Sequence, residues 1–417
     1  MTAPLLLDLT HTSHTQARTG IQRVARALHT ELTARGAALA VTWDPHERVW
    51  RPLEAWETAN LAQTTAGAKR SARWPLTAKL RGMLRRRLGR ASTFPLSALR
   101  FPLANSGLLQ TELFSATVAT ALPALFARAH GPCVALFHDA LALKFPELAP
   151  PKTVARFPAY LQELSRFDGI AAISADSRDA LLSYWDWLGL RDTPPVEAIP
   201  LGIDLPPIAA PADCNPLGYT PSWPAVPAAL PTVLCVCTLE GRKNHLVLLE
   251  AGEQLWTRGV RFELRVIGMA QAETGRTALA RVHALQQAGR PLRYDGPVDD
   301  NTVTAAYRDC QFTVYPSLLE GFGLPVLESL ALGKPCVCSA RGPVGESARG
   351  GGCVALDEVN PATLAAAIER LLATPVELAA LATAARARRL KGWAAYTDEL
   401  LAWQRTLRHR SLGAGRA

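Results

Sequence analysis

The chain has 417 residues and a formal net charge of +9, with 48% hydrophobic and 19% charged residues. This length predicts two or three domains, and the composition excludes a largely disordered chain. No apolar run reaches the roughly 18 residues of a membrane-spanning helix, and the start, MTAPLLLDLT, lacks the basic region of a secretory signal, so we expect a cytoplasmic protein.

Apolar strands alternate with amphipathic helices along the first half of the chain. Strands are expected at residues 5–9, 38–43, 132–137, 169–173 and 196–199. Helices are expected over 19–36, where apolar residues recur at helical spacing, and over 174–185. This alternation predicts a parallel sheet with helices on both faces.

A proline-dense stretch, 206–230, reads as a linker, and a second alternating series follows it. In that series, strands are expected at 232–237, 262–267, 312–315 and 336–339, and helices over 244–253, 359–373, 375–391 and 393–407. The predicted class is α/β, with two doubly wound Rossmann-like domains, 1–205 and 231–392, whose strand ends face one cleft. Residues 393–417 are expected to form a helix that packs back toward the first domain, followed by a tail.

The cysteines and acidic pairs do not predict a metal site. None of the eight cysteines forms a C-x-x-C pair. The pairs Cys235/Cys237 and Cys336/Cys338 each lie on one face of an apolar strand, which favours buried thiols over zinc ligands. Asp299-Asp300 is not a D-x-D motif and is expected to cap the helix that follows. We therefore expect no catalytic metal and no other cofactor.

Residues 74–101 are the most basic segment of the chain. Five apolar residues recur there at helical spacing, and arginines and lysine crowd the other faces; the apolar set is Leu76, Leu80, Met83, Leu84 and Leu88. Two interpretations stay open: a basic amphipathic helix over 76–90 that lies on anionic lipid, or a core-facing helix with a solvated basic face. The segment lacks the interleaved aromatic residues of a nucleic-acid surface, so we expect no nucleic acid.

The most informative segment is 320–339, EGFGLPVLESLALGKPCVCS. A strand ends before it, a glycine turn follows at 321–323, and Pro325 marks the start of a helix. The N–H groups at such a helix start bind anions and hydroxyl-rich ligands. Glu320 precedes the helix and Glu328 lies one turn inside, so both can face one ligand. A turn with a helix-stabilising carboxylate would give the same pattern.

Glu320 and Glu328, with seven residues between them, resemble the E-x7-E signature of retaining GT-B glycosyltransferases of family 4. Further segments match that family in order, at 137–147, 171–178, 199–204, 238–251, 266–268 and 294–300. Residues 19–28 are similar to the N-terminal glycine loop of polysaccharide mannosyl- and rhamnosyltransferases. The resemblance covers about 1–48, 131–205 and 231–405, and leaves 49–130 as a basic insertion.

The resemblance implies a role for each matched residue. Arg242 and Lys243 follow a strand, where they would neutralise the leaving diphosphate. Glu320 would hold the donor sugar, and His138 would lie beside it as a further catalytic residue. Arg23 and Asp139 are candidates for contact with the acceptor or phosphate, and Asp139 could also orient His138. The donor-binding set is Gly20, Gly268, Tyr294, Val298, Gly321, Phe322, Gly323, Leu324 and Glu328.

The expected function is therefore retaining transfer of a hexose from a sugar nucleotide, in surface polysaccharide synthesis. Domain 1–205 would bind a saccharide or polyprenyl-linked acceptor, and 231–392 the donor, with GDP-mannose as the first expectation. The alternatives are a rhamnosyl- or UDP-sugar-dependent transferase, a sugar-nucleotide epimerase, and a non-catalytic, basic membrane-binding GT-B protein.

Overall fold

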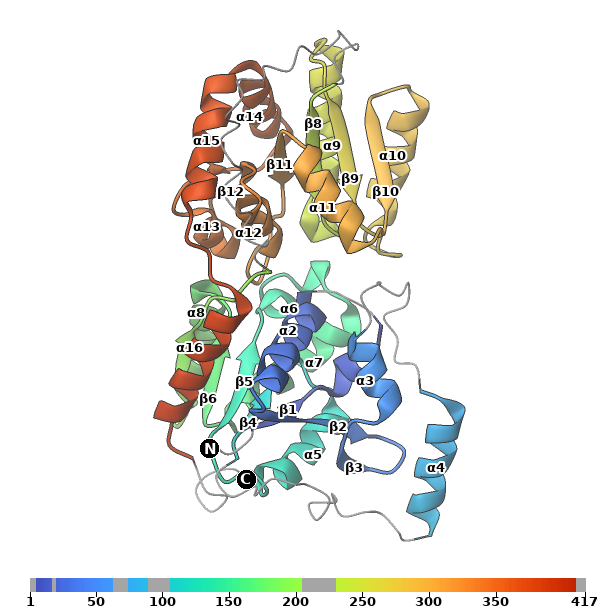
Figure 1. The fold of residues 1–417 in the computed structure, drawn as a ribbon, viewed down its shortest axis with the longest axis vertical. Helices are drawn as coiled ribbons and strands as arrows, with labels where there is room; N and C mark the ends of the chain where they lie inside the picture. Colours follow the sequence, from blue (N-terminus) through green and yellow to red (C-terminus); the bar gives the residue numbers. More distant parts are fainter. Residues whose placement is uncertain (1–4, 17–19, 63–73, 89–105, 205–229, 410–417) are drawn as a thin grey trace, which may run out of the picture. The chain divides into compact units, whose positions relative to one another are not determined.

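The computed structural model describes residues 5–16, 20–62, 74–88, 106–204 and 230–409 (Figure 1). The chain divides into two compact units: Met1–Gly202 with Trp393–Ala417, and Ile203–Gly392. Each unit is built around one sheet. The expected linker, 206–230, lies outside the described residues except for its last position. None of the described helices combines the length and the apolar character needed to span a bilayer.

The first unit contains a seven-stranded sheet in the order β3-β2-β1-β4-β5-β6-β7. Its strands are β1 (Leu5–Asp8), β2 (Ala38–Asp44), β3 (Val49–Pro52), β4 (Leu108–Gln110), β5 (Cys133–Phe137), β6 (Gly169–Ala172) and β7 (Val196–Ala198). The neighbouring strands are parallel, as the alternation predicts, except that β3 runs antiparallel to β2. The parallel sheet that the sequence predicts thus carries one further, unpredicted strand at its edge, where a short turn joins β2 and β3 as an antiparallel hairpin.

The interpretation of 49–130 as an insertion is also wrong. This segment contains β4, which pairs with β1 on one side and β5 on the other, in the middle of the sheet. It also contains α5 (Ala116–Phe126), whose residues Leu122 and Leu125 are buried in the core. A strand of three residues has too few positions to show a periodic pattern, which is why the sequence does not reveal it.

Helices flank the first sheet. They are α1 (Thr10–Ser13), α2 (Gly20–Ala34), α3 (Ala55–Ala62), α4 (Leu76–Arg87), α5, α6 (Leu141–Lys144), α7 (Pro151–Leu164) and α8 (Ala175–Trp187). The C-terminal helix α16 (Trp393–Thr406) packs against α2, and Gln404 Nε2 donates to the Pro132 carbonyl oxygen at 2.8 Å. The last helix thus belongs to the first unit although the second unit precedes it in sequence.

The second unit contains a six-stranded parallel sheet in the order β10-β9-β8-β11-β12-β13. Its strands are β8 (Thr232–Val236), β9 (Glu263–Ile267), β10 (Leu292–Gly296), β11 (Phe312–Tyr315), β12 (Cys336–Ser339) and β13 (Cys353–Leu356). Its helices are α9 (His245–Thr257), α10 (Arg276–Gln287), α11 (Asp300–Asp309), α12 (Leu324–Ala331), α13 (Gly342–Ala348), α14 (Pro361–Ala373) and α15 (Pro375–Ala387). Asp299 caps α11, accepting from the Thr302 N–H at 2.7 Å, as predicted.

The strand order of the second sheet locates its binding edge. Numbered from the first strand of the unit, the order is 3-2-1-4-5-6, which is the doubly wound dinucleotide-binding topology. The direction of winding reverses between β8 and β11, which are hydrogen-bonded neighbours. Ligands of such sheets bind beyond the carboxyl ends of the strands at this reversal. The loops that follow β8 and β11 therefore lie at the expected binding edge.

Candidate active site

Two loops meet at the reversal point of the second sheet. The loop after β8 forms a short 3-10 turn, Gly241–Lys243, and the loop after β11 carries Glu320. Backbone bonds tie them together: the Leu318 N–H donates to the Arg242 carbonyl at 2.9 Å. Arg242 Nη1 also donates to the Leu319 carbonyl at 3.0 Å. The side chains on both loops are therefore held in fixed relative positions.

Glu320 is the centre of a buried polar cluster. Its Oε2 accepts from Arg242 Nη1 at 2.8 Å, and its Oε1 pairs with Lys243 Nζ. Tyr315, at the end of β11, donates its hydroxyl to Oε1 at 2.6 Å, and the Ser317 hydroxyl donates to the same oxygen. The structure thus brings together three of the sequence-predicted catalytic residues and two that were not predicted.

Arg242 has a second carboxylate partner. Its Nη2 lies 2.7 Å from Oε1 of Glu240, while about a quarter of the Arg242 side chain stays exposed. Lys243 is buried, and Tyr315 accepts from its Nζ at 2.6 Å. The sequence gives one usable signal for the unpredicted members: Tyr315 and Glu240 lie at or just beyond the carboxyl ends of adjacent parallel strands, where ligand-binding side chains collect.

The electrostatics keep Glu320 ionised. Burial alone would raise its pKa, but the positive charges of Lys243 and Arg242 outweigh it and lower the pKa to about 2. For Arg242, the desolvation that would lower its pKa is outweighed by Glu320 and Glu240, which raise it. The cluster consequently brings two basic side chains, Arg242 and Lys243, together at the end of β8. Such fixed positive charges can stabilise negative charge that grows on a leaving phosphate.

The glycine turn before α12 lies on the same loop as Glu320. Gly323 is the N-cap of α12 and has φ +99°, a left-handed conformation that favours glycine. Ser347 Oγ donates to the Phe322 carbonyl at 2.7 Å, which fixes the turn, and Phe322 and Leu324 are buried. The helix begins at Leu324, so Pro325 is its second residue rather than its first.

Three of the donor-binding candidates lie around the ends of β9 and β10. Gly268 has φ +143°, and a Cβ at this position would lie 2.0 Å from the Cys237 carbonyl oxygen. Tyr294 donates its hydroxyl to the Gly268 carbonyl at 2.9 Å. The Val298 side chain packs against the core of the unit, so a ligand at this position would meet the Val298 backbone. Glu328 is half-buried in the second turn of α12.

Cys235 on β8 and Cys237 just after it are buried, as the sequence predicts for core thiols, but they have an unpredicted neighbour. His245, the first residue of α9, places Nε2 at 3.3 Å from Sγ of Cys237 and 3.9 Å from Sγ of Cys235. The two sulfur atoms are 3.8 Å apart. These three donor atoms are close enough together to approach one cation. They lie beside the cluster around Glu320. The positive charge of Lys243, a member of that cluster, acts on both thiols.

The first unit carries the remaining candidates. His138 follows β5 and is buried, with Nε2 2.8 Å from the Thr111 carbonyl oxygen. A carbonyl only accepts, so Nε2 carries the proton. Burial lowers the pKa of His138, which favours the neutral ring. The Asp139 carboxylate accepts from the Leu141 N–H at 3.1 Å, which places it at the start of α6.

Gly20 and Arg23 both belong to α2. Gly20 is its exposed first residue, where a Cβ would meet open space, and Arg23 is half-buried in the first turn. A buried carboxylate that the sequence analysis missed lies at the reversal point of the first sheet, between β1 and β4. Glu112 accepts from the N–H groups of His11 and Thr12 at 2.9 and 3.2 Å. Only its position after the unpredicted strand β4 would have identified it.

The chain is similar in sequence to known glycosyltransferases. The glycosyl transferases group 1 family matches residues 225–388. The serotype-specific mannosyltransferase WbdA of Escherichia coli is 25% identical over 333 residues, covering 79% of this chain and 38% of that protein. O-antigen chain mannosyltransferase B of Escherichia coli is 29% identical over 212 residues, covering 49% of this chain and 52% of that protein. The chain thus spans about half or less of the length of these relatives.

A solved structure shares the fold over the whole length. Anabaena HepE in complex with UDP-glucose aligns with a TM-score of 0.65 at 16% identity, covering 97% of this chain and 100% of that one. The doubly wound second unit, the resemblance of the 320–339 segment and the family match agree. Residues 225–388 therefore form a glycosyl transferases group 1 domain, in a chain whose two parallel-sheet units have the GT-B glycosyltransferase fold.

Proposed function

We propose that this protein transfers mannose from GDP-mannose to a saccharide or lipid-linked acceptor in the synthesis of a surface polysaccharide. The observation that carries the proposal is the pairing of Arg242 and Lys243 with Glu320 at the reversal point of the second sheet. A sugar nucleotide can break its glycosidic bond only if the charge that develops on the diphosphate is stabilised. The names of WbdA and mannosyltransferase B support mannose as the sugar.

In the proposed mechanism, Glu320 acts through the cations. Its carboxylate uses both oxygens for Arg242, Lys243 and Tyr315, so its main task is to hold the two positive groups in place. The amide groups at the start of α12 and Glu328 would contact the sugar and the ribose. Transfer would retain the configuration at the anomeric carbon, with the leaving phosphate accepting the proton of the attacking hydroxyl. Because two fixed cations are present, this step needs no divalent metal.

A panel of nucleotides tests the donor. GDP is expected to raise the melting temperature of the protein more than UDP, dTDP or ADP, because a ligand that binds only the native state stabilises it. Arg242→Ala should remove most of this shift. A clear preference for UDP or dTDP would overturn the choice of GDP-mannose. The proposed transfer reaction would then use a UDP- or dTDP-linked sugar as its donor.

A product assay tests the reaction. With GDP-mannose and a polyprenyl-linked or free saccharide acceptor, NMR of the product should show the anomeric configuration of the donor. Release of free sugar without any acceptor would instead indicate an epimerase or hydrolase. An inverted product would contradict the retaining mechanism while leaving the assignment of the phosphate-binding cations intact.

A further inference from the structure

The helix α4 presents its apolar residues outward, unlike a helix that packs on a core. The large side chains on its outer face are exposed: Leu76 by 75%, Leu80 by 64%, Met83 by 46%, Leu84 by 59% and Leu88 by 59%. The residues that face the protein are instead small, since Ala78 and Gly82 are buried. Of the two interpretations that the sequence leaves open, a core-facing apolar stripe is therefore wrong.

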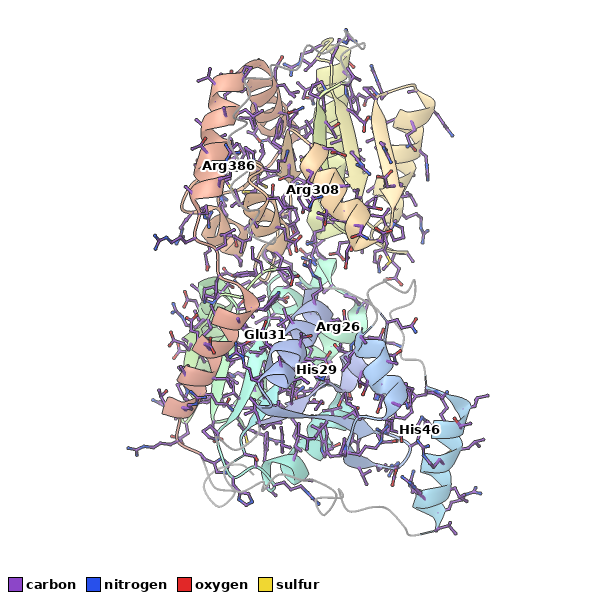
Figure 2. The ribbon with its side chains drawn as sticks, viewed as in Figure 1. Arg26, His29, Glu31, His46, Arg308 and Arg386 are labelled. Atoms are coloured by element: carbon purple, nitrogen blue, oxygen red, sulfur yellow. The ribbon has the colours of Figure 1, made fainter. Side chains whose placement is uncertain are left out.

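The inner face explains how α4 is held. Gly82 packs so closely on the β2–β3 loop that a Cβ would lie 2.9 Å from Cβ of His46, which Figure 2 shows beside the helix. Arg81 pairs with Glu54, and Arg85 Nη1 lies 3.4 Å from Oε2 of Glu47. These contacts fix the helix without using its leucines. The outer face is thus available to a partner.

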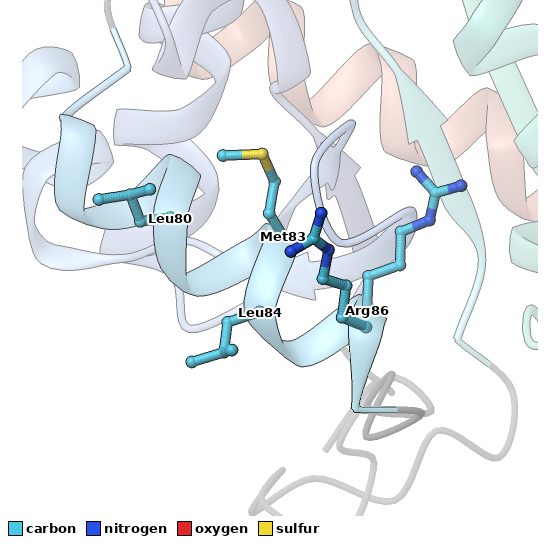
Figure 3. Close-up of a pocket in the computed structure, with 5 residues that line it drawn as sticks. Leu80, Met83, Leu84 and Arg86 are labelled. Atoms are coloured by element: carbon cyan, nitrogen blue, oxygen red, sulfur yellow. The ribbon is translucent and has the colours of Figure 1, made fainter.

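The remaining basic residues border the exposed leucines. Within the described ranges, Lys79, Arg86 and Arg87 have no ion-pair partner. Figure 3 shows Leu80, Met83, Leu84 and Arg86 projecting from α4, where with Arg87 they line an open pocket. On a helix with 3.6 residues per turn, Arg87 falls among the leucines, and Lys79 and Arg86 lie along one side of them. An exposed apolar stripe with basic residues at its border is typical of a helix that lies in a membrane interface.

From this arrangement we infer that α4 docks the protein on an anionic lipid bilayer, with its leucines in the acyl boundary and Lys79, Arg86 and Arg87 against lipid phosphates. The excess of unpaired positive charge selects this partner, because a second copy of the same face would bring like charges together. Docking goes beyond the proposed function, and it holds whatever the donor is. It would bring the enzyme to an acceptor that is carried on a lipid.

Vesicle sedimentation tests the inference with the full-length protein. Wild type should bind vesicles containing phosphatidylglycerol, bind pure phosphatidylcholine much less, and release as salt increases. Replacing Lys79, Arg86 and Arg87 with glutamine should weaken binding by on the order of 100-fold, since each basic residue near such a surface contributes about a fivefold factor. Leu80→Asp with Leu84→Asp should abolish binding even at low salt.

Matched controls separate docking from general charge or hydrophobicity. Arg349→Gln with Arg389→Gln removes two exposed arginines elsewhere, and Val376→Asp changes an apolar residue of α15 that is more exposed than Leu80 and Leu84. Both controls should bind vesicles like wild type. All variants should keep the wild-type melting temperature, because the inner face of α4 is unchanged. Equal vesicle binding by wild type and the α4 variants would overturn the inference, as would a loss of self-association in those variants without vesicle binding by wild type.

Discussion

Arg242 Nη1 lies 2.8 Å from Oε2 of Glu320, although the two residues are 78 positions apart along the chain. The two side chains meet because β8 and β11 are adjacent in the second sheet while three helices and two strands intervene in sequence. The same carboxylate pairs with Lys243. One anionic side chain therefore positions two cations from the neighbouring loop, and the proposed chemistry depends on this arrangement.

Removing either cation should slow transfer strongly. We expect Arg242→Ala or Lys243→Ala to reduce kcat/KM by on the order of 100-fold or more, since each removes a charge that would stabilise the leaving diphosphate. Arg258→Ala is the matched control, because Arg258 is an exposed arginine of the same unit that pairs with Glu369. Initial rates with a saturating acceptor measure the effect. Near-normal rates for both site variants would remove these residues from the leaving-group role.

Glu320→Gln should destabilise the protein in a manner that depends on pH. The pKa of Glu320 is about 2 in the folded protein against an ordinary value of 4.5, so the folded state binds the proton less readily than the unfolded state. This difference in pKa corresponds to about 3 kcal/mol of unfolding free energy. The contribution is fully present above pH 4.5 and is lost as pH falls toward 2. Urea unfolding of both proteins between pH 3 and pH 8 measures it.

The expected result for Glu320→Gln is a gap in unfolding free energy that is constant from pH 5 to 8 and narrows below pH 4.5. The loss has a physical cause, because the variant leaves two cations beside a neutral amide. If the difference in unfolding free energy between wild type and Glu320→Gln is the same at pH 3 as at pH 7, the ion pairs of Glu320 contribute little to stability. Glu273→Gln, at an exposed position of the same unit, should show no such pH dependence.

Transfer activity should persist in excess EDTA. Arg242 and Lys243 supply positive charge at the position where the diphosphate is proposed to leave, so a divalent cation is not required there. Activity that EDTA abolishes and Mg²⁺ or Mn²⁺ restores would contradict this assignment. Restoration by Zn²⁺ alone would point instead to the group formed by Cys235, Cys237 and His245.

The sequence predicts the candidate site of the second unit better than it predicts that of the first. The strands that end at Val236 and Tyr315 have long apolar patterns and motif residues just beyond them, so the meeting of Lys243 with Glu320 can be anticipated. The partners Tyr315 and Ser317 cannot, because which side chains turn toward a carboxylate depends on the loop path. In the first unit, the three-residue strand β4 has no detectable period, and Glu112 stays hidden with it.

The two interpretations of α4 show a different limit. Both a membrane-surface helix and a core-facing helix produce the spacing of Leu76, Leu80 and Leu84, because spacing reports only that the leucines share a face. Which face turns toward the protein is decided by close packing at Gly82, a position that the sequence analysis did not single out. Small residues opposite an apolar stripe are the signal that would have distinguished the two.

His138 should be mainly neutral at pH 6.5, in the tautomer that carries its proton on Nε2. Burial lowers its pKa, and although the bond to the Thr111 carbonyl and the charge of Asp139 oppose this shift, desolvation is the larger effect. Because the folded state binds this proton less readily than the unfolded state, the contribution of His138 to stability is full above pH 6.5 and decreases as pH falls below it. Imidazole ¹⁵N shifts, assigned with His138→Gln, should show a protonated Nε2 and an unprotonated Nδ1 at pH 6.5 and above. A ring of His138 that becomes doubly protonated near pH 6.5 would contradict the burial that holds it neutral.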